Sequence, residues 1–197
     1  MQRRNVFVAG LLLVLTAAVF LARTYLGDRA PPHPLAGSYT VAATSLPALR
    51  VTFGDPAWNG RAVPDGQQCR RFEGRGDTPA LQVDEIPAGA NAVLIEFNDE
   101  TYRPMDNGGH GIVGFRTSGP RILVPSIPGE TLDGLPAGAF VEVPHRAGDY
   151  GGPGYLPPCS GGQGNLYTVT VKAVFKSDTD PAANKLLAQT RVELGRY

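Results

Sequence analysis

The strongest candidates for a nucleophile, Cys159 and Ser160, lie side by side late in the chain. Ser160 could form a Ser/His/Asp set with His110 or His145 and with Asp99 or Asp149. The adjacent Cys159 with His110 is a rival nucleophile pair. The residues around Ser160 do not form the Gly-x-Ser-x-Gly turn on which many hydrolases present their nucleophile. The sequence therefore predicts a protein without enzymatic activity, and a Cys- or Ser-dependent hydrolase is the less favoured alternative.

The chain has two cysteines, Cys69 and Cys159. No Cys-x-x-Cys or His-x-x-x-His spacing is present, so we expect no metal site. In an oxidising compartment the two cysteines could form a disulfide that closes a loop of about ninety residues. The alternative is a pair of buried free thiols. A disulfide would remove Cys159 as a nucleophile.

Composition excludes several classes of function. Eighteen Lys and Arg balance eighteen Asp and Glu, so the net charge is zero and the basic excess of a nucleic-acid-binding protein is missing. Low net charge and 42% hydrophobic residues are also unlike a disordered chain. The 25 Gly and 18 Pro among 197 residues indicate many short elements and one globular domain.

An apolar run from Val6 to Ala22 follows two arginines at the N-terminus. A cleaved secretory signal has an apolar centre of about 7–15 residues, whereas a membrane-spanning helix needs about 17–25. The run favours an uncleaved anchor over residues 1–26, with the domain periplasmic or extracellular; a cleaved signal would make it a secreted protein. The Pro-rich residues 27–37 are typical of an extended stalk, and we expect no role for His33 there.

The domain expected over residues 38–197 is rich in short apolar stretches bounded by Gly and Pro. Several alternate with period two, which is typical of half-buried strands. The expected strands are Tyr39–Ala42, Leu49–Phe53, Ala92–Phe97, Ile112–Phe115, Ile122–Val124, Ala139–Val143 and Leu166–Phe175. Together they predict a mainly β fold, an antiparallel β-sandwich.

A single soluble helix is expected near the C-terminus. Asp180 is a suitable N-cap, Pro181 suits the first helical position, and residues through Ala188 favour a helix. Thr190–Leu194 alternates again and indicates a closing strand.

Three blocks of the sequence carry a family resemblance. The first contains Trp58-Asn59-Gly60-x-x-Val63-Pro64, Cys69 and Ile86-Pro87-Ala88-Gly89; the second runs from Ala92 through Asp99 and Pro104 to His110; the third contains Gly148-Asp149-Tyr150-Gly151, Gly154-Tyr155, Pro157-Pro158-Cys159 and Tyr167. In order and spacing these blocks resemble the phosphatidylethanolamine-binding protein family, which includes the Raf kinase inhibitor protein and bacterial relatives. The chain departs from the family's Asp-Pro-Asp loop at Asp99-Glu100-Thr101 and from its His-Trp pair at His110-Gly111.

The resemblance implies a cleft that binds an anion. The residues carried over are Asp99, His110, Tyr155, Pro157, Pro158, Cys159 and Tyr167, with the Tyr155–Gly161 loop as one wall. A histidine can donate to an anion while an aspartate holds its other ring nitrogen, and a tyrosine hydroxyl adds a neutral donor. Backbone N–H groups of a Gly-rich turn can form an anion-binding nest. This chemistry requires neither a metal nor an organic cofactor.

The function implied by the resemblance is non-catalytic binding of a small phosphate- or carboxylate-bearing ligand, such as a phospholipid headgroup. The alternative is an exported interaction or inhibitor module, with a vestigial cleft and a protein partner outside the cytoplasm. Attachment to the membrane would be through the N-terminal helix, and no nucleic-acid partner is expected.

Overall fold

The computed structural model describes residues 32–41 and 43–197. Residues from Pro32 to Tyr197 form a compact unit, which includes both hydrophobic cores described below, so we expect this unit to fold without the preceding residues. The expected membrane anchor lies outside the described residues. Within the described part of the chain, no helix has the length and apolar character required to cross a bilayer.

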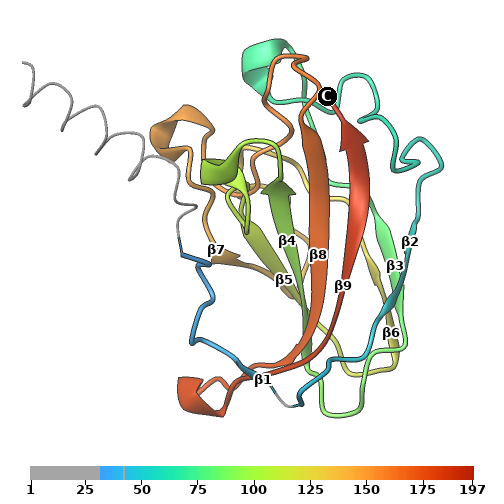
Figure 1. Cartoon of the computed structure of the whole chain (residues 1–197), viewed down its shortest axis with the longest axis vertical. Helices are drawn as coiled ribbons and strands as arrows, with labels where there is room; N and C mark the ends of the chain where they lie inside the picture. The colour runs from blue at the N-terminus through green and yellow to red at the C-terminus, as the bar shows by residue number, and fades with distance from the viewer. Residues whose placement is uncertain (1–31, 42) are drawn as a thin grey trace, which may run out of the picture. The chain divides into compact units, whose positions relative to one another are not determined.

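Two β-sheets make up the described chain (Figure 1). The strands are β1 (Thr40–Val41), β2 (Arg50–Phe53), β3 (Leu81–Asp84), β4 (Ala92–Asp99), β5 (Ile112–Arg116), β6 (Arg121–Val124), β7 (Ala139–Val143), β8 (Leu166–Phe175) and β9 (Lys185–Arg196). Single 3-10 turns lie at η1 (Arg70–Phe72), η2 (Arg103–Met105), η3 (Gly148–Tyr150) and η4 (Pro181–Ala183).

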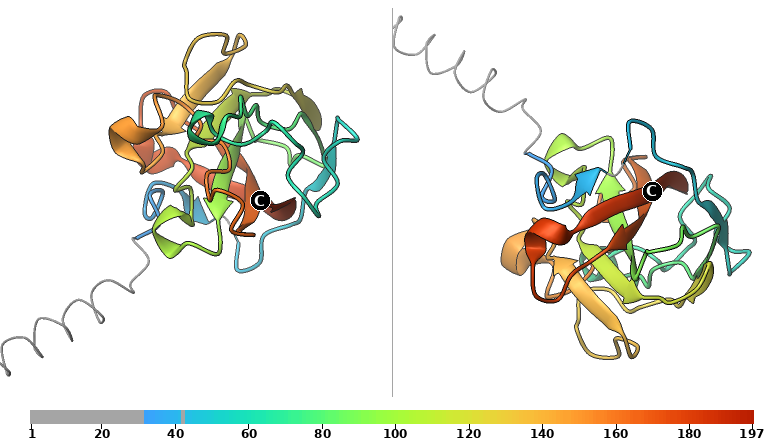
Figure 2. Two further views of the ribbon diagram at one scale, coloured as in Figure 1. Left: turned by 90° about the horizontal axis from the view of Figure 1, so that it is seen from above. Right: turned by 90° about the horizontal axis from the view of Figure 1, so that it is seen from below.

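The larger sheet is mixed. Its order is β1-β9-β8-β4-β5-β7, and the smaller sheet has the order β2-β3-β6. The short β1 runs parallel to β9, whereas the other strand pairs of the described chain are antiparallel. The expectation of an antiparallel sandwich is therefore corrected to a mainly β fold with a mixed sheet. The cause is the N-terminal segment, which lies across the outer face of the larger sheet and adds its strand at the β9 edge (Figure 2).

Strand β4 is buried along its whole length because both faces of the larger sheet are covered. Val93, Ile95 and Phe97 belong to a large core that also contains residues of the smaller sheet. Ala92 and Leu94 belong to a second, smaller core. A strand covered on both faces reads as a continuous apolar run, as this one does.

The sequence predicted most strands but missed β3 and misassigned the start of β9. In β3 the polar Gln82 and Asp84 interrupt a short run, and only pairing with β2 and β6 establishes the strand. Asp180 does cap, because its carboxylate accepts from the N–H of Ala182 at 3.0 Å, but the turn ends after three residues. The expected helix is wrong because β9 begins at Lys185 and pairs with β8 along its length.

Candidate functional site

The predicted site residues from distant parts of the chain meet at one end of the larger sheet. Asp99 is the last residue of β4 and Tyr167 is the second residue of β8, and the two are register partners across the antiparallel pair. His110 lies in the loop before β5, where its N–H donates to the carbonyl of Phe97 at 3.1 Å. The carbonyl of His110 accepts from the N–H of Leu156 at 3.0 Å, which attaches the Tyr155–Gly161 loop to the same place.

Asp99 is 3% exposed, and its carboxylate is fully engaged. One oxygen accepts from the N–H groups of Thr101, at 3.0 Å, and Tyr102, at 2.9 Å. The other accepts from the side-chain amide of Asn165 at 2.7 Å. Asp99 therefore stabilises the turn after β4, and it acts on the rest of the site through its negative charge.

His110 is equally buried, and a backbone carbonyl orients its ring. Nδ1 lies 2.8 Å from the carbonyl oxygen of Leu156, so this nitrogen is the donor and carries the proton. Desolvation lowers the pKa of His110 from its ordinary 6.5, against the opposing effects of the Leu156 carbonyl and the Asp99 charge. The ring is therefore neutral at pH 7, and it meets the Tyr167 ring edge-on with centroids 5.3 Å apart.

Tyr167 connects β8 to the loop. Its hydroxyl oxygen accepts from the N–H of Cys159 at 3.0 Å. Burial raises the pKa of Tyr167 to about 12, so the hydroxyl stays protonated under ordinary conditions. This hydrogen bond from Cys159 to Tyr167 therefore holds the Tyr155–Gly161 loop against β8.

The disulfide between Cys69 and Cys159 is present, with Cα atoms 5.3 Å apart. This confirms the bridge that the sequence left open, and both cysteines of the chain are used in it. The Cys159–His110 nucleophile pair is thereby removed, because a disulfide sulfur is not a thiolate. Ser160 is also engaged: its hydroxyl donates to the carbonyl of Tyr197 at 2.6 Å.

The other loop residues support the site from behind. Tyr155 is buried, with its ring 4.3 Å from that of Phe97, and burial raises the pKa of its hydroxyl. The carbonyl of Pro158 accepts from the N–H of Cys69 at 3.0 Å. Pro157 packs so closely on Gly129 that a Cβ there would lie 2.3 Å from the proline Cγ. These three residues therefore fix the position of the loop.

Asp99, His110 and Tyr167, together with the loop over them, form the His110 cluster, and side chains fill its interior. Its small cavity leaves no room for a water molecule, and it is lined by Phe97, Asn98, His110, Tyr155, Tyr167, Thr168 and Leu194. The predicted residues come together, and a ligand would have to approach from the outside of the loop.

Two residues that the sequence reasoning missed lie at that outer side. Tyr150 is 47% exposed, and its hydroxyl lies 3.6 Å from Sγ of Cys159. The guanidinium carbon of Arg71 lies 4.7 Å from the centre of the Tyr150 ring. The resemblance included Tyr150 in a quoted block, but only the disulfide brings Arg71 beside it. A cation is thereby placed next to the loop.

His145, the other histidine considered as a base, has a structural role. Its Nδ1 accepts from the N–H of Ala147 at 3.1 Å, so the proton is on Nε2, which donates to the carbonyl of Gly152. Within the described residues, no group of three or more His, Cys, Asp or Glu side chains is arranged to hold a metal ion.

The sequence matches no family model and no curated protein. Among solved structures, the chain is similar to a protein from Chlamydia trachomatis described as a homologue of phosphatidylethanolamine-binding proteins. The two share 19% sequence identity with a TM-score of 0.46, and the match covers 76% of this chain and 97% of that chain.

Proposed function

We propose that this domain is a phosphatidylethanolamine-binding-like module that binds a small phosphate- or carboxylate-bearing anion without catalysing a reaction. The observation that carries the proposal is the convergence of Asp99, His110 and Tyr167 beneath a disulfide-tied loop. Asp99 and Tyr167 are 68 positions apart in the sequence, and the pairing of β4 with β8 places them side by side at one end of the sheet. The sequence blocks that carry the resemblance are the ones that build this place.

The charge beside the loop supports an anion as the ligand. Arg71 is exposed and stacks on Tyr150, so its guanidinium is held at the surface next to Cys159. A guanidinium is always charged and can bind a phosphate or carboxylate through two parallel hydrogen bonds. Neutral His110 and protonated Tyr167 carry no negative charge. The Asp99 carboxylate is engaged by the N–H groups of Thr101 and Tyr102 and by the amide of Asn165.

The engagement of the candidate nucleophiles supports a non-catalytic role. Cys159 is in a disulfide and the Ser160 hydroxyl donates to a carbonyl. His110 and His145 each donate from one ring nitrogen to a backbone carbonyl. None of these groups forms the nucleophile–base hydrogen bond on which covalent catalysis depends.

The second candidate is a protein-interaction module outside the cytoplasm. The filled interior beneath the loop favours this reading, because a ligand finds no preformed chamber there. The exposed Arg71–Tyr150 pair would then contact a protein surface, since Arg and Tyr are enriched where binding energy concentrates. The disulfide supports a location in the periplasm or outside the cell for either function, with residues 1–26 as the proposed membrane attachment.

The deciding experiment is an NMR titration of the Pro32–Tyr197 unit with phosphate, phosphoethanolamine and acetate. We expect chemical-shift changes at Arg71, Tyr150 and residues 154–164, and their loss in Arg71→Gln. His110→Asn is the companion variant, because the asparagine amide can keep the donor to Leu156 while the ring is removed. Arg121→Gln, on exposed β6 of the smaller sheet, is the matched charge control and should bind as the parent does.

A folded parent domain that responds to none of the three anions would contradict ligand binding and favour the interaction module. Shifts that persist unchanged in Arg71→Gln would place the anion elsewhere. Release of a product from a phosphate ester or carboxylate ester would overturn the non-catalytic role.

A further inference from the structure

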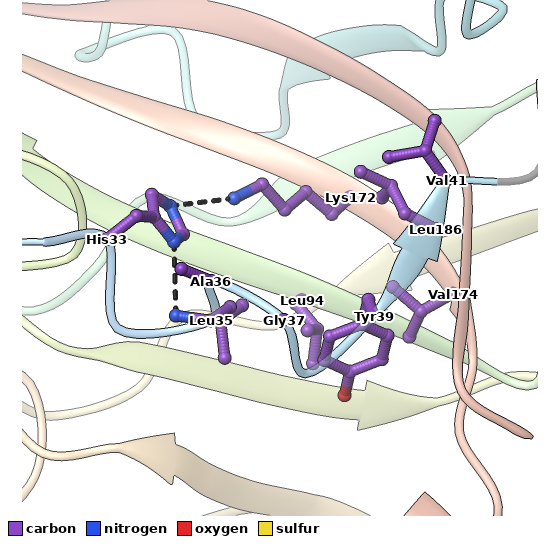
Figure 3. Close-up of a pocket in the computed structure, with 10 residues that line it drawn as sticks. All are labelled: His33, Leu35, Ala36, Gly37, Tyr39, Val41, Leu94, Lys172, Val174 and Leu186. Carbon is purple, nitrogen blue, oxygen red and sulfur yellow. Dashed lines mark hydrogen bonds between the residues drawn. The ribbon is translucent and has the colours of Figure 1, made fainter. Parts of the chain in front are cut away.

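A cavity of about 300 Å³ lies between the N-terminal segment and the outer face of the larger sheet, separate from the His110 cluster (Figure 3). It is lined by His33, Leu35, Ala36, Gly37, Tyr39, Val41, Leu94, Lys172, Val174 and Leu186. This volume is at the lower end of the range of small-molecule sites, which are mostly apolar with a few placed polar groups.

Hydrogen bonds attach the N-terminal segment, residues 33–41, which forms one wall of the cavity, to the larger sheet. β1 pairs with β9, and the Thr40 hydroxyl donates to the carbonyl of Asn184 at 3.0 Å. The Tyr39 hydroxyl donates to Glu142 at 2.8 Å. Within the segment, the N–H of Ala36 donates to the carbonyl of His33 at 2.9 Å. The wall is therefore built by specific bonds, and His33 has a position that the expected stalk did not foresee.

Most of the cavity surface is apolar. Leu94 and Val174 form its floor and are fully buried in the smaller core. Leu186 lines it from β9, and Leu35 and Tyr39 line it from the segment. An aliphatic group placed here would remain in contact with hydrocarbon on both sides.

One end of the cavity carries a buried cation. Lys172 lines the cavity, is 8% exposed and forms an ion pair with Glu96, which is 2% exposed and does not line it. The ammonium group lies at the end of the cavity that His33 lines, where it also contacts Glu96. In Figure 3 the Lys172 side chain reaches toward His33, and its Nζ lies 3.1 Å from Nε2 of that histidine.

The hydrogen bonds of His33 determine what Lys172 can still bind. Nδ1 of His33 accepts from the N–H of Leu35 at 3.1 Å, so in the neutral ring the proton is on Nε2. That N–H donates to Glu96, with 2.8 Å between Nε2 and Oε2. A nitrogen that donates cannot also accept from Lys172, so the ammonium group keeps N–H donors for an oxygen acceptor in the cavity.

We propose that this cavity is a second ligand site, which takes a monocarboxylate with a short aliphatic chain. The carboxylate binds the ammonium group of Lys172, and the chain lies against Leu94, Val174 and Leu186. The charge of Lys172 selects the acid over a neutral or cationic molecule of the same length, because a charge-assisted hydrogen bond is stronger in a place with little water.

The test is calorimetric and NMR titration of the Pro32–Tyr197 unit with octanoate, 1-octanol and octylamine. Octanoate should bind about tenfold more tightly than octanol, as expected for one hydrogen bond to a charged group. Octylamine should bind more weakly than octanol because its ammonium group meets Lys172. Shifts should appear at Leu94, Val174 and Leu186, and the residues around His110 should not move.

Two variants test separately the binding of the aliphatic chain and the binding of the carboxylate. Leu186→Trp fills the cavity and should abolish binding of both octanoate and octanol; Leu123→Trp is the matched control, because Leu123 is 61% exposed on β6. The double variant Lys172→Met/Glu96→Gln removes both charges together and so leaves no unpaired buried ion. It should still bind octanol but lose the preference for octanoate.

Equal affinity for octanoate and octanol in the parent domain would overturn the role of Lys172. Binding that survives Leu186→Trp, or the lack of any octanoate binding by the folded parent, would overturn the site itself. Because phosphate binding at Arg71 is measured separately, either proposal can fail while the other holds.

Discussion

Nδ1 of His110 lies 2.8 Å from the carbonyl oxygen of Leu156, and the histidine is almost fully buried at this position. This bond joins the loop before β5 to the loop that carries the disulfide. The ring is neutral at pH 7 because burial lowers the pKa of His110 below its ordinary 6.5, although the bond to Leu156 favours the protonated form. The arrangement therefore makes the stability of the domain depend on pH.

The first prediction follows from the sign of this shift. Below pH 6.5 the unfolded chain takes up a proton at His110 that the folded domain resists, so stability falls as the pH drops from 6.5 toward the lower folded pKa. The slope from this group can reach about 1.4 kcal/mol per pH unit. Urea unfolding of the Pro32–Tyr197 unit at a series of pH values measures it.

His110→Asn should remove this part of the slope, since asparagine does not titrate. Carboxylates such as Glu96 contribute at lower pH and serve as an internal reference. Burial alone would raise the pKa of Glu96, but the His33 bond and the Lys172 charge outweigh it and the pKa is lowered. An unchanged slope between pH 6.5 and 5 in His110→Asn would contradict the assignment to His110.

The second prediction concerns the Cys69–Cys159 disulfide. It joins residues 90 positions apart, and a loop of that length restricts the unfolded chain strongly. In the chain-entropy model, reduction should lower the free energy of unfolding by about 4 kcal/mol. Urea unfolding with and without a phosphine reductant provides the measurement. Cys69→Ala/Cys159→Ala should be destabilised in the same way and be insensitive to the reductant.

The third prediction concerns close packing of Gly114 on β5 against Phe140 on β7. The two are cross-strand partners, and a Cβ on Gly114 would lie 2.2 Å from the tip of the aromatic ring. Gly114→Ala should therefore destabilise the domain by about 1–3 kcal/mol, as overpacking does. Gly119→Ala is the matched control, because the nearest atom to its added Cβ is 3.9 Å away. Equal thermal midpoints for the two variants would show that the ring moves aside freely.

The fourth prediction concerns the buried Glu96–Lys172 ion pair. Lys172→Met alone leaves the buried Glu96 carboxylate without its ammonium partner while the His33 bond remains, and the cost should be about 3–5 kcal/mol. Glu96→Gln/Lys172→Met removes both charges and should cost much less than the sum of the single changes. A double-mutant cycle by denaturant unfolding measures the coupling, and additive effects would show that the two charges act independently.

Strands with a local signal could be predicted from the amino-acid sequence alone. Leu166–Phe175 alternates clearly and is β8, and Ala139–Val143 is β7 with the predicted ends. The sequence also provided the residues of the His110 cluster, because the blocks that resemble a known family carry Asp99, His110 and Tyr167 in order. These signals depend on neighbouring residues or on spacing, both of which are visible in a linear chain.

Elements and bonds whose partners are far away in the sequence became visible only in the tertiary structure. Asp180 and Pro181 favour a helix, yet pairing with β8 extends β9 back to Lys185, because a row of ladder bonds and a buried Ala188 outweigh local propensity. Only the folded chain shows that Cys69 and Cys159 lie close enough to form a disulfide.

The role of His33 is likewise visible only in the tertiary structure. The local composition around this residue indicates only an extended segment, while its side chain binds Glu96, 63 positions away. Long-range pairings of this kind arise from packing of the whole sheet, and no short stretch of sequence contains the information that specifies them.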